Sequence, residues 1–443
     1  MDGLVMAGQL ILALAILVTL HELGHYLAAR AFGIRVEKFY LFFDAWGKKL
    51  FSFTKGDTEY GIGWLPLGGY VKISGMIDES MDKDAMKEEP KDYEFRSKPA
   101  WQRLIVMVAG VFMNVVLGIA LFAFILLVYK KDYVPTSEVK GIYANQLGKE
   151  IGLQDGDKML EIDGKPFERF NDVTSYKGYF ANTLTVERSG ERKTIEVPED
   201  FYKNLKSKDA KARFISAGPL SYQIGQVVGG GNAEKAGFKS KDFLVAINNE
   251  NLDGLRSLPE VFGDYKNKNV SVKVEREGKT LDLNTDVTDK GTIGIQYGSV
   301  PRLPSSIKKS KYNLGSAINY GAKDAVDALV VNAIGIGKIF QGKESASESV
   351  QGPIGIAVIF GPEWIWEKFW WLTAMLSMIL AFMNILPIPA LDGGHAMFLT
   401  LEAVSGRKFS DKFMERVQVF GMLILLTLMA FILGNDIWKH WIN

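Results

Sequence analysis

Four long runs of apolar residues stand out along the chain, near residues 4–25, 104–128, 369–386 and 417–433. A helix needs about 20 predominantly apolar residues to cross a bilayer. A buried core helix is the alternative for each run, but the second and fourth are too long and too uniformly apolar for it. The pattern therefore predicts a polytopic α-helical membrane protein with four transmembrane helices. The first run has no preceding basic residue and no small-residue cleavage pattern, so we expect a retained helix, not a signal peptide.

Basic residues near the ends of these runs predict the orientation. They follow the first run, precede the second and separate the third from the fourth, as Arg30, Arg35, Lys38, Lys98, Arg103, Arg407, Lys408, Lys412 and Arg416. Such residues favour the cytoplasmic side of a membrane. Both termini and the block from about 130 to 362 are then expected on the outer side, because long translocated domains do not follow this rule.

The segments between the runs are rich in strand and turn residues. Residues 61–76 read GIGWLPLGGYVKISGM, which predicts a β-hairpin with a turn at 66–69. Residues 152–164, GLQDGDKMLEIDG, resemble residues 237–249, GFKSKDFLVAINN. Residues 184–197 and 270–283 are each a pair of strands around a glycine turn. Two copies of one small β-rich domain are predicted. An amphipathic helical pattern at 305–341 is expected along the membrane surface.

Composition narrows the chemistry. The 443 residues include no cysteine and only four histidines, and the net charge is +1. The absence of cysteine excludes disulfides, thiolate catalysis and cysteine-ligated metal. A net charge this small predicts no nucleic-acid partner. The sequence does not indicate an oligomeric state.

The first apolar run leads into His21-Glu22-Leu23-Gly24-His25, an H-E-x-x-H motif. Positions i and i+4 share a helix face, so both imidazoles can reach one metal ion, and Glu22 can act as general base toward a water. Two histidines just beyond a helix end are the alternative. Burying these groups at membrane depth is costly without a partner, which favours the metal.

A catalytic zinc ion needs a third protein ligand. The best candidate is Asp392, which follows Pro387 and Pro389 where these residues interrupt the third apolar run. Irregular backbone at membrane depth is tolerated only where it lines a cavity. A loop carboxylate in an Asp-Gly-Gly turn is the alternative, and His395 is a rival ligand.

Two asparagines lie within or at the end of apolar runs. Asn384 is a candidate for holding the substrate backbone or a developing oxyanion, with a helix-ending cap as the equal alternative. Asn114 has a similar ambiguity, and a polar bond between helices is its simpler interpretation.

The order of these motifs resembles the site-2 protease family of intramembrane zinc metalloproteases, and within it the bacterial regulator-of-sigma-E protease type. The motifs are HELGH, LPLGGYVKISG, FRSKPAWQR, the two repeats and NILPIPALDGGH, and they cover almost the full length. The resemblance implies zinc held by His21, His25 and Asp392, with Glu22 as base and Asn384 assisting substrate binding. It also implies two periplasmic PDZ-like domains and a membrane-re-entrant hairpin at 61–76.

The implied organisation follows the chain. It comprises a first transmembrane helix (1–32), a cytoplasmic-side region with the hairpin (33–100), a second transmembrane helix (101–129), PDZ-like domains (130–221 and 222–304), an amphipathic periplasmic linker (305–362), and the last two transmembrane helices (363–443). Glycines of the hairpin that are candidates for binding substrate by strand pairing are Gly61, Gly63, Gly68 and Gly69.

The implied activity is regulated proteolysis in the bacterial inner membrane, with the active site toward the cytoplasm. Substrates would be single-span membrane proteins already trimmed by another protease, of the anti-sigma-factor or remnant-signal-peptide kind. Two segments depart from the family pattern, which often has Gly-Phe-Gly near Leu41–Gly47 and Ala-Gly-Pro where Ala109-Gly110-Val111 stands. These departures concern substrate preference, not the metal motif.

Three other classes compete with this interpretation. A catalytically inactive membrane scaffold that presents PDZ domains would not need an intact H-E-x-x-H motif. A metal transporter would spread polar residues over several helices and depths, whereas here they concentrate at two helix ends. A soluble-type zinc protease with one anchoring helix would place the motif in a water-exposed domain.

Overall fold

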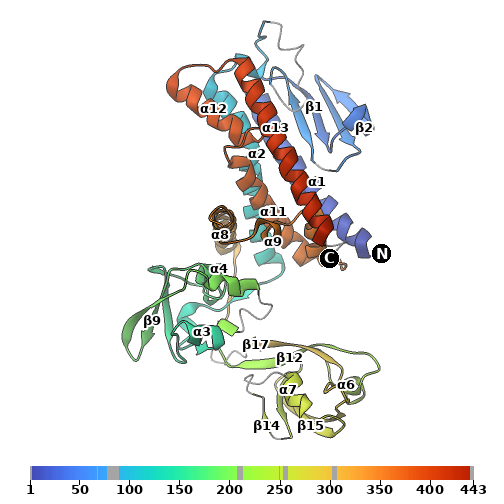
Figure 1. Ribbon diagram of the computed structural model, residues 1–443, viewed down its shortest axis with the longest axis vertical. Helices are drawn as coiled ribbons and strands as arrows, with labels where there is room; N and C mark the ends of the chain where they lie inside the picture. Colours follow the sequence, from blue (N-terminus) through green and yellow to red (C-terminus); the bar gives the residue numbers. More distant parts are fainter. Residues whose placement is uncertain are drawn as a thin grey trace. The chain divides into compact units, whose positions relative to one another are not determined.

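The computed structural model describes residues 2–66, 68–76, 89–206, 213–248, 250–252, 258–301 and 307–439. The chain divides into two compact units, one formed by residues 1–131 with 312–443 and the other by residues 132–311. Figure 1 traces both along the chain. Leu67 of the expected 66–69 turn and Asn249 of the second repeat lie outside the described residues.

Four helices of the first unit are long and apolar enough to cross a membrane. They coincide with the four predicted runs and are α1 (Asp2–Ala31), α2 (Ala100–Val128), α11 (Trp366–Ile385) and α13 (Asp411–Ile437). Helix α2 packs against α1, α8, α11 and α12, so it is the central helix of the unit. The proline-rich segment predicted to break the third run does so, because α11 ends at Ile385 and α12 (Asp392–Ser405) begins seven residues later.

Three further helices complete this unit, namely α8 (Leu314–Phe340), α9 (Ala346–Ser349) and α10 (Pro353–Phe360). Helix α8 lies within residues 305–341, where the sequence predicts a helical pattern. It begins with a capping box between Asn313 and Ser316. Its small residues Ala325 and Ala328 lie in one apolar cluster with Phe122 of α2. One face of α8 is therefore packed within the helical unit.

A four-stranded sheet lies between α1 and α2 in the sequence. Its strands are β1 (Val36–Leu41), β2 (Lys49–Lys55), β3 (Thr58–Gly63) and β4 (Tyr70–Ile73), in the order β2-β3-β1-β4. The predicted hairpin at 61–76 is wrong, because β3 and β4 do not pair with each other. Strand β1 lies between them, parallel to β3 and antiparallel to β4. Strands β3 and β4 are thus two strand spacings apart, about 10 Å.

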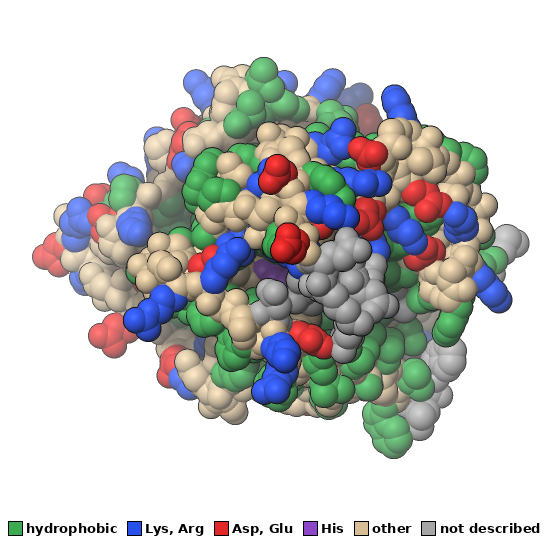
Figure 2. Space-filling model, turned by 90° about the horizontal axis from the view of Figure 1, so that it is seen from above, with side chains coloured by type: hydrophobic (Ala, Val, Ile, Leu, Met, Phe, Trp, Pro, Cys, Tyr) green, Lys and Arg blue, Asp and Glu red, His purple; other side chains and the backbone are tan. Residues whose placement is uncertain are grey.

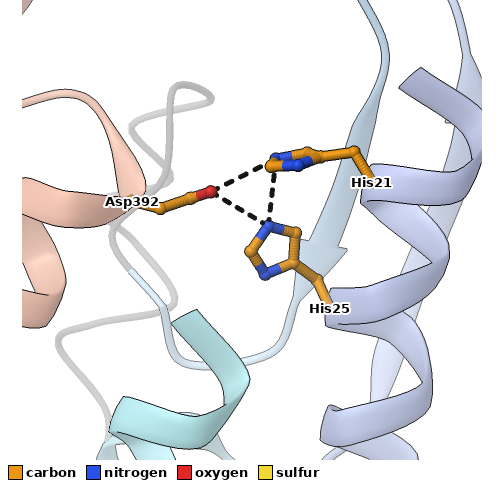
Figure 3. Close-up of side chains that lie close together, drawn as sticks. All are labelled: His21, His25 and Asp392. Carbon is orange, nitrogen blue, oxygen red and sulfur yellow. Dashed lines mark hydrogen bonds and ion pairs between the residues drawn. The ribbon is translucent and has the colours of Figure 1, made fainter. Parts of the chain in front are cut away.

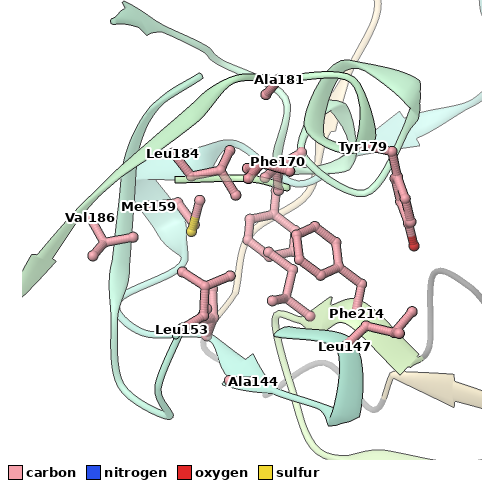
Figure 4. Close-up of a cluster of buried hydrophobic side chains, with 14 of the residues drawn as sticks. Ala144, Leu147, Leu153, Met159, Phe170, Tyr179, Ala181, Leu184, Val186 and Phe214 are labelled. Carbon is pink, nitrogen blue, oxygen red and sulfur yellow. The ribbon is translucent and has the colours of Figure 1, made fainter. Parts of the chain in front are cut away.

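The second unit has two β-rich halves. The first half has a sheet of order β10-β9-β7-β8 and a pair β11-β6, and the second half has a sheet of order β16-β15-β13-β12-β17. Figure 4 shows the apolar core of the first half, where Leu147, Phe170 and Phe214 are buried.

The remaining elements of this unit are as follows: β5 (Asp132–Tyr133), β6 (Tyr143–Ala144), α3 (Gln146–Glu150), β7 (Lys158–Ile162), β8 (Lys165–Pro166), α4 (Tyr176–Tyr179), β9 (Thr183–Arg188), β10 (Glu191–Glu196), β11 (Ile215–Ser216), β12 (Leu220–Val227), α6 (Asn232–Lys235), β13 (Phe243–Ile247), β14 (Glu250–Asn251), α7 (Leu258–Gly263), β15 (Asn269–Arg276), β16 (Lys279–Asp286), β17 (Ile295–Pro301) and β18 (Ser310–Lys311).

The two halves repeat one ion pair at matching positions. Arg188 Nε lies 2.7 Å from Asp157 Oδ1, and Arg276 Nε lies 2.7 Å from Asp242 Oδ1. Both carboxylate side chains are fully buried. Arg188 also donates to the Gly152 carbonyl, and Arg276 donates to the Gly237 carbonyl. These two glycines are the first residues of the repeated segments 152–164 and 237–249. The internal similarity seen in the sequence thus corresponds to a buried Asp–Arg ion pair that both halves contain.

We predict that Arg188→Met destabilises the first β-rich half by about 3–5 kcal/mol, because it leaves the Asp157 carboxylate buried without its partner. The matched control is Arg192→Met, since Arg192 pairs with Glu161 on the surface of the same sheet. That change should cost about 1 kcal/mol or less. Pulse proteolysis of the full chain in detergent measures both, and equal stabilities of the two variants would contradict the prediction.

Candidate metal centre

Helix α1 places both motif histidines on one face. His21 and His25 are one turn apart, and their Nε2 atoms lie 3.3 Å from each other. Asp392, the first residue of α12, points at this pair: its Oδ2 is 3.2 Å from His21 Nε2 and 3.3 Å from His25 Nε2 (Figure 3). Among the described residues these three form the one group of side chains suited to hold a metal ion.

The triangle has the dimensions that a zinc ion requires. Tetrahedral zinc with ligand bonds of about 2.0–2.1 Å keeps its ligand atoms about 3.3–3.4 Å apart. The three observed separations are 3.2, 3.3 and 3.3 Å. Asp392 Oδ2 is buried and has no hydrogen-bond donor among the described residues. Three converging ligand atoms with a fourth position open fit a catalytic zinc.

Helix α2 lies directly behind the histidines. A Cβ on Gly110 would lie 2.3 Å from His25 Nε2 and 2.6 Å from His21 Cε1, so only glycine leaves room for both rings. A Cβ on Gly24 would lie 2.4 Å from the Ala109 carbonyl oxygen. His25 Nδ1 is 2.8 Å from the Val106 carbonyl oxygen and donates to it, which leaves the Nε2 lone pair free for a metal.

The loop before α12 positions Asp392. Ala390 has a φ of 75°, which is unfavourable for a residue with a side chain. A Cβ on Gly393 would lie 2.3 Å from the Leu386 carbonyl oxygen, and one on Gly394 would lie 2.4 Å from that of Ile388. The Asp-Gly-Gly sequence is therefore not a surface turn. Its two glycines let the first turn of α12 pack against the segment between α11 and α12. In this position the Asp392 side chain points toward α1.

Glu22 lies on α1 between the two histidines, and the backbone N–H of Val71 in β4 lies near its carboxylate. The order of the sheet makes β4 an edge strand. The edge of the sheet and the expected general base are thus adjacent.

Asn384, near the end of α11, is also at the centre, with its Nδ2 3.4 Å from His21 Nε2. His395 is not in the metal group. It lines a cavity with Arg103 and Glu402, which form an ion pair. The geometry therefore favours Asp392 over His395 as the third metal ligand.

The four candidate glycines, two in β3 and two in the segment before β4, are close-packed positions. A Cβ on Gly61 would lie 2.4 Å from the Tyr40 ring, and a Cβ on Gly63 would lie 2.2 Å from the Phe43 main chain. Gly68 and Gly69 meet the Phe43 ring and the Tyr40 carbonyl in the same way. Packing explains these glycines, and their role in binding substrate stays a prediction.

Sequence reasoning singled out Asn114 but missed that α2 lies against both motif histidines. Val106, Gly110 and Asn114 recur every four residues, so they share one face of the helix. The signal was a glycine and an asparagine four residues apart in an otherwise apolar run.

Comparison with known proteins agrees with this geometry. The family model of peptidase family M50 matches residues 9–428. The chain is 28% identical to the regulator of sigma E protease of Haemophilus influenzae, over 97% of this chain and 98% of that protein. It is also 28% identical to the regulator of sigma-E protease RseP of Escherichia coli, over 96% and 97%, and 29% identical to the metalloprotease MmpA of Caulobacter vibrioides, over 99% and 96%. The chain therefore belongs to peptidase family M50, the site-2 proteases, and is a zinc-dependent metalloprotease of the regulator-of-sigma-E protease type.

Proposed function

We propose that this protease hydrolyses peptide bonds within or near the transmembrane segment of single-span membrane proteins that another protease has already trimmed. Anti-sigma factors and remnant signal peptides are the substrate kinds that fit. The observation that carries the proposal is the convergence of His21, His25 and Asp392 from two elements of a unit that contains four membrane-length helices. A carboxylate and two imidazoles at such a site need a compensating partner.

Each residue of the centre has a proposed role. His21, His25 and Asp392 would hold the zinc ion, which would supply Lewis acidity to the attacking water. Glu22 takes the proton of the attacking water and delivers it to the leaving amine. Asn384, beside His21, donates from its amide to the peptide oxygen on which negative charge develops.

Strand β4 is the proposed docking edge for the substrate. A transmembrane helix hides its carbonyl groups in internal hydrogen bonds, so the substrate must become extended to be cut. A free sheet edge binds an extended peptide as an added strand. The Val71 backbone of β4 lies near the Glu22 carboxylate, so a peptide along this edge would pass close to the proposed general base.

Contacts among the basic residues from which the orientation was inferred support placing them on one side of the membrane. Arg103 at the start of α2 pairs with Glu402 of α12, and Lys408 donates to the Arg96 carbonyl. The segments expected in the cytoplasm therefore lie together at one end of the helical unit. Figure 2 shows Lys and Arg side chains distributed over the face seen from above, with acidic groups between them. The inner membrane of a bacterium, with both termini and the β-rich unit periplasmic, is the proposed location.

The two β-rich halves are proposed to be PDZ-like domains that act before the chemistry. Strand β17 lies at an edge of the second sheet, and such an edge can hold a peptide end. A pair of domains outside the membrane also excludes substrates with bulky outer domains. Trimming by another protease would then be required for access.

We predict that Glu22→Gln retains zinc and loses cleavage by about 10²- to 10⁴-fold, because the amide cannot accept the proton of the water. His21→Ala should lose both zinc and cleavage. Zinc content is measured on the detergent-purified full chain. Cleavage is followed on one single-span membrane protein, with its outer domain present and with it removed.

Wild type should cut only the trimmed form. Equal cleavage by Glu22→Gln would refute the role of the base, and zinc retained by His21→Ala would refute the metal site. Equal cleavage of both substrate forms would refute the proposed size exclusion and leave the proposed metal site and base untouched.

We predict that Val71→Pro lowers cleavage by about 10- to 100-fold with zinc content unchanged, because it removes a backbone donor beside Glu22 and disturbs the docking edge. Val71→Ala keeps the backbone N–H and is the matched control, with near-wild-type cleavage expected. If Val71→Pro cleaves as well as Val71→Ala, strand addition at β4 is wrong.

A further inference from the structure

The two nitrogens of each motif histidine have different polar partners. The Nε2 atoms lie near each other and near Asp392 Oδ2, whereas each Nδ1 atom has a polar partner on α2. His25 Nδ1 lies 2.8 Å from the Val106 carbonyl oxygen, and His21 Nδ1 lies 3.1 Å from Asn114 Nδ2. Helix α2 thus supplies one partner to each ring, on either side of Gly110.

The two contacts differ in their chemistry. An imidazole that binds a metal through Nε2 in its neutral form carries its proton on Nδ1, and that proton needs an acceptor. The Val106 carbonyl is such an acceptor for His25. An amide nitrogen is not an acceptor, so Asn114 Nδ2 cannot serve His21 in this way. The amide oxygen of the same side chain can.

The other end of the Asn114 amide is unsatisfied. Its Oδ1 is buried and has no hydrogen-bond partner among the described residues, and the residue as a whole is fully buried. A half-turn of the amide about Cβ–Cγ exchanges oxygen and nitrogen with almost no change of shape. It gives Oδ1 a donor, the His21 Nδ1 proton, and removes the contact between two groups that would both donate.

We propose that Asn114 is a positioning residue of the metal centre. Its Oδ1 accepts the proton of His21 Nδ1 and thereby fixes the tautomer and the ring plane in which Nε2 faces the zinc. This inference rests on the zinc site proposed above. It assigns Asn114 a task beyond a polar bond between helices: the contact of its side chain is with a metal ligand on α1, not with α11.

The position of Asn114 is itself held by α11. The Ser377 hydroxyl donates to the Asn114 main-chain oxygen at 2.7 Å, and both residues are fully buried. The Ser377 side chain thus bonds to the main chain of Asn114, whereas the Asn114 side chain bonds to His21. Replacing it disturbs the α2–α11 contact alone, which makes Ser377→Ala a matched control.

The test compares Asn114→Leu and Asn114→Asp in the detergent-purified full chain, by zinc affinity in chelator-buffered zinc. Leucine has a similar size but cannot accept a proton, so its Kd for zinc should rise by about 10- to 100-fold. Aspartate accepts from Nδ1–H, so its Kd should stay within about threefold of wild type, as for Ser377→Ala. A role in packing alone predicts the opposite ranking, because leucine suits an apolar interior and a buried carboxylate does not.

The outcomes separate the two proposals. If wild type and His21→Ala hold zinc equally well, the zinc site is wrong. If only His21→Ala loses zinc and Asn114→Leu binds as tightly as wild type, or Asn114→Asp binds as weakly as Asn114→Leu, the role of Asn114 is wrong. Thermal unfolding of the zinc-free proteins reports whether each variant folds, and Asn114→Ala, expected to weaken zinc binding like leucine, replaces Asn114→Leu if it does not.

Discussion

The close approach of α1 to α2 is the contact on which the metal centre depends. At Gly24 the two backbones come so near that a Cβ would lie 2.4 Å from the Ala109 carbonyl oxygen, and a Cβ on Gly110 would lie 2.3 Å from the His25 imidazole. Lipid supplies no hydrophobic force between helices, so close packing at small residues must hold them together. The same contact brings the α2 partners of His21 and His25 within reach. The contact that packs the two helices therefore also positions the histidine rings.

The third ligand depends on a second constraint, the interruption between α11 and α12. Polar side chains at membrane depth are costly and must meet partners inside the protein. The prolines end α11, Ala390 adopts a left-handed conformation, and two glycines let α12 begin against the broken segment. Asp392 then faces α1 from the opposite end of the chain. A zinc ion bound there would offset the cost of burying the three proposed ligands.

The sequence predicted the features that one segment encodes by itself. Apolar length identified four helices, and the i, i+4 spacing identified the facing histidines. It also selected Asp392, because a carboxylate beside a proline break needs a partner. Pairing between segments was harder: β1 lies between β3 and β4, which residues 61–76 alone do not reveal. The role of α2 was missed because Gly110 and Asn114 acquire their function only when α1 packs against them.

The most direct test of the central claim is zinc-edge X-ray absorption on the purified full chain. The account predicts one zinc per chain with a shell of nitrogen and oxygen ligands at about 2.0–2.1 Å and outer-shell scattering from two imidazole rings. Replacing Asp392 by alanine should change this shell while both imidazoles remain detectable in any zinc still bound. A zinc shell with no imidazole scattering, or with three rings, would contradict a site built from His21, His25 and Asp392.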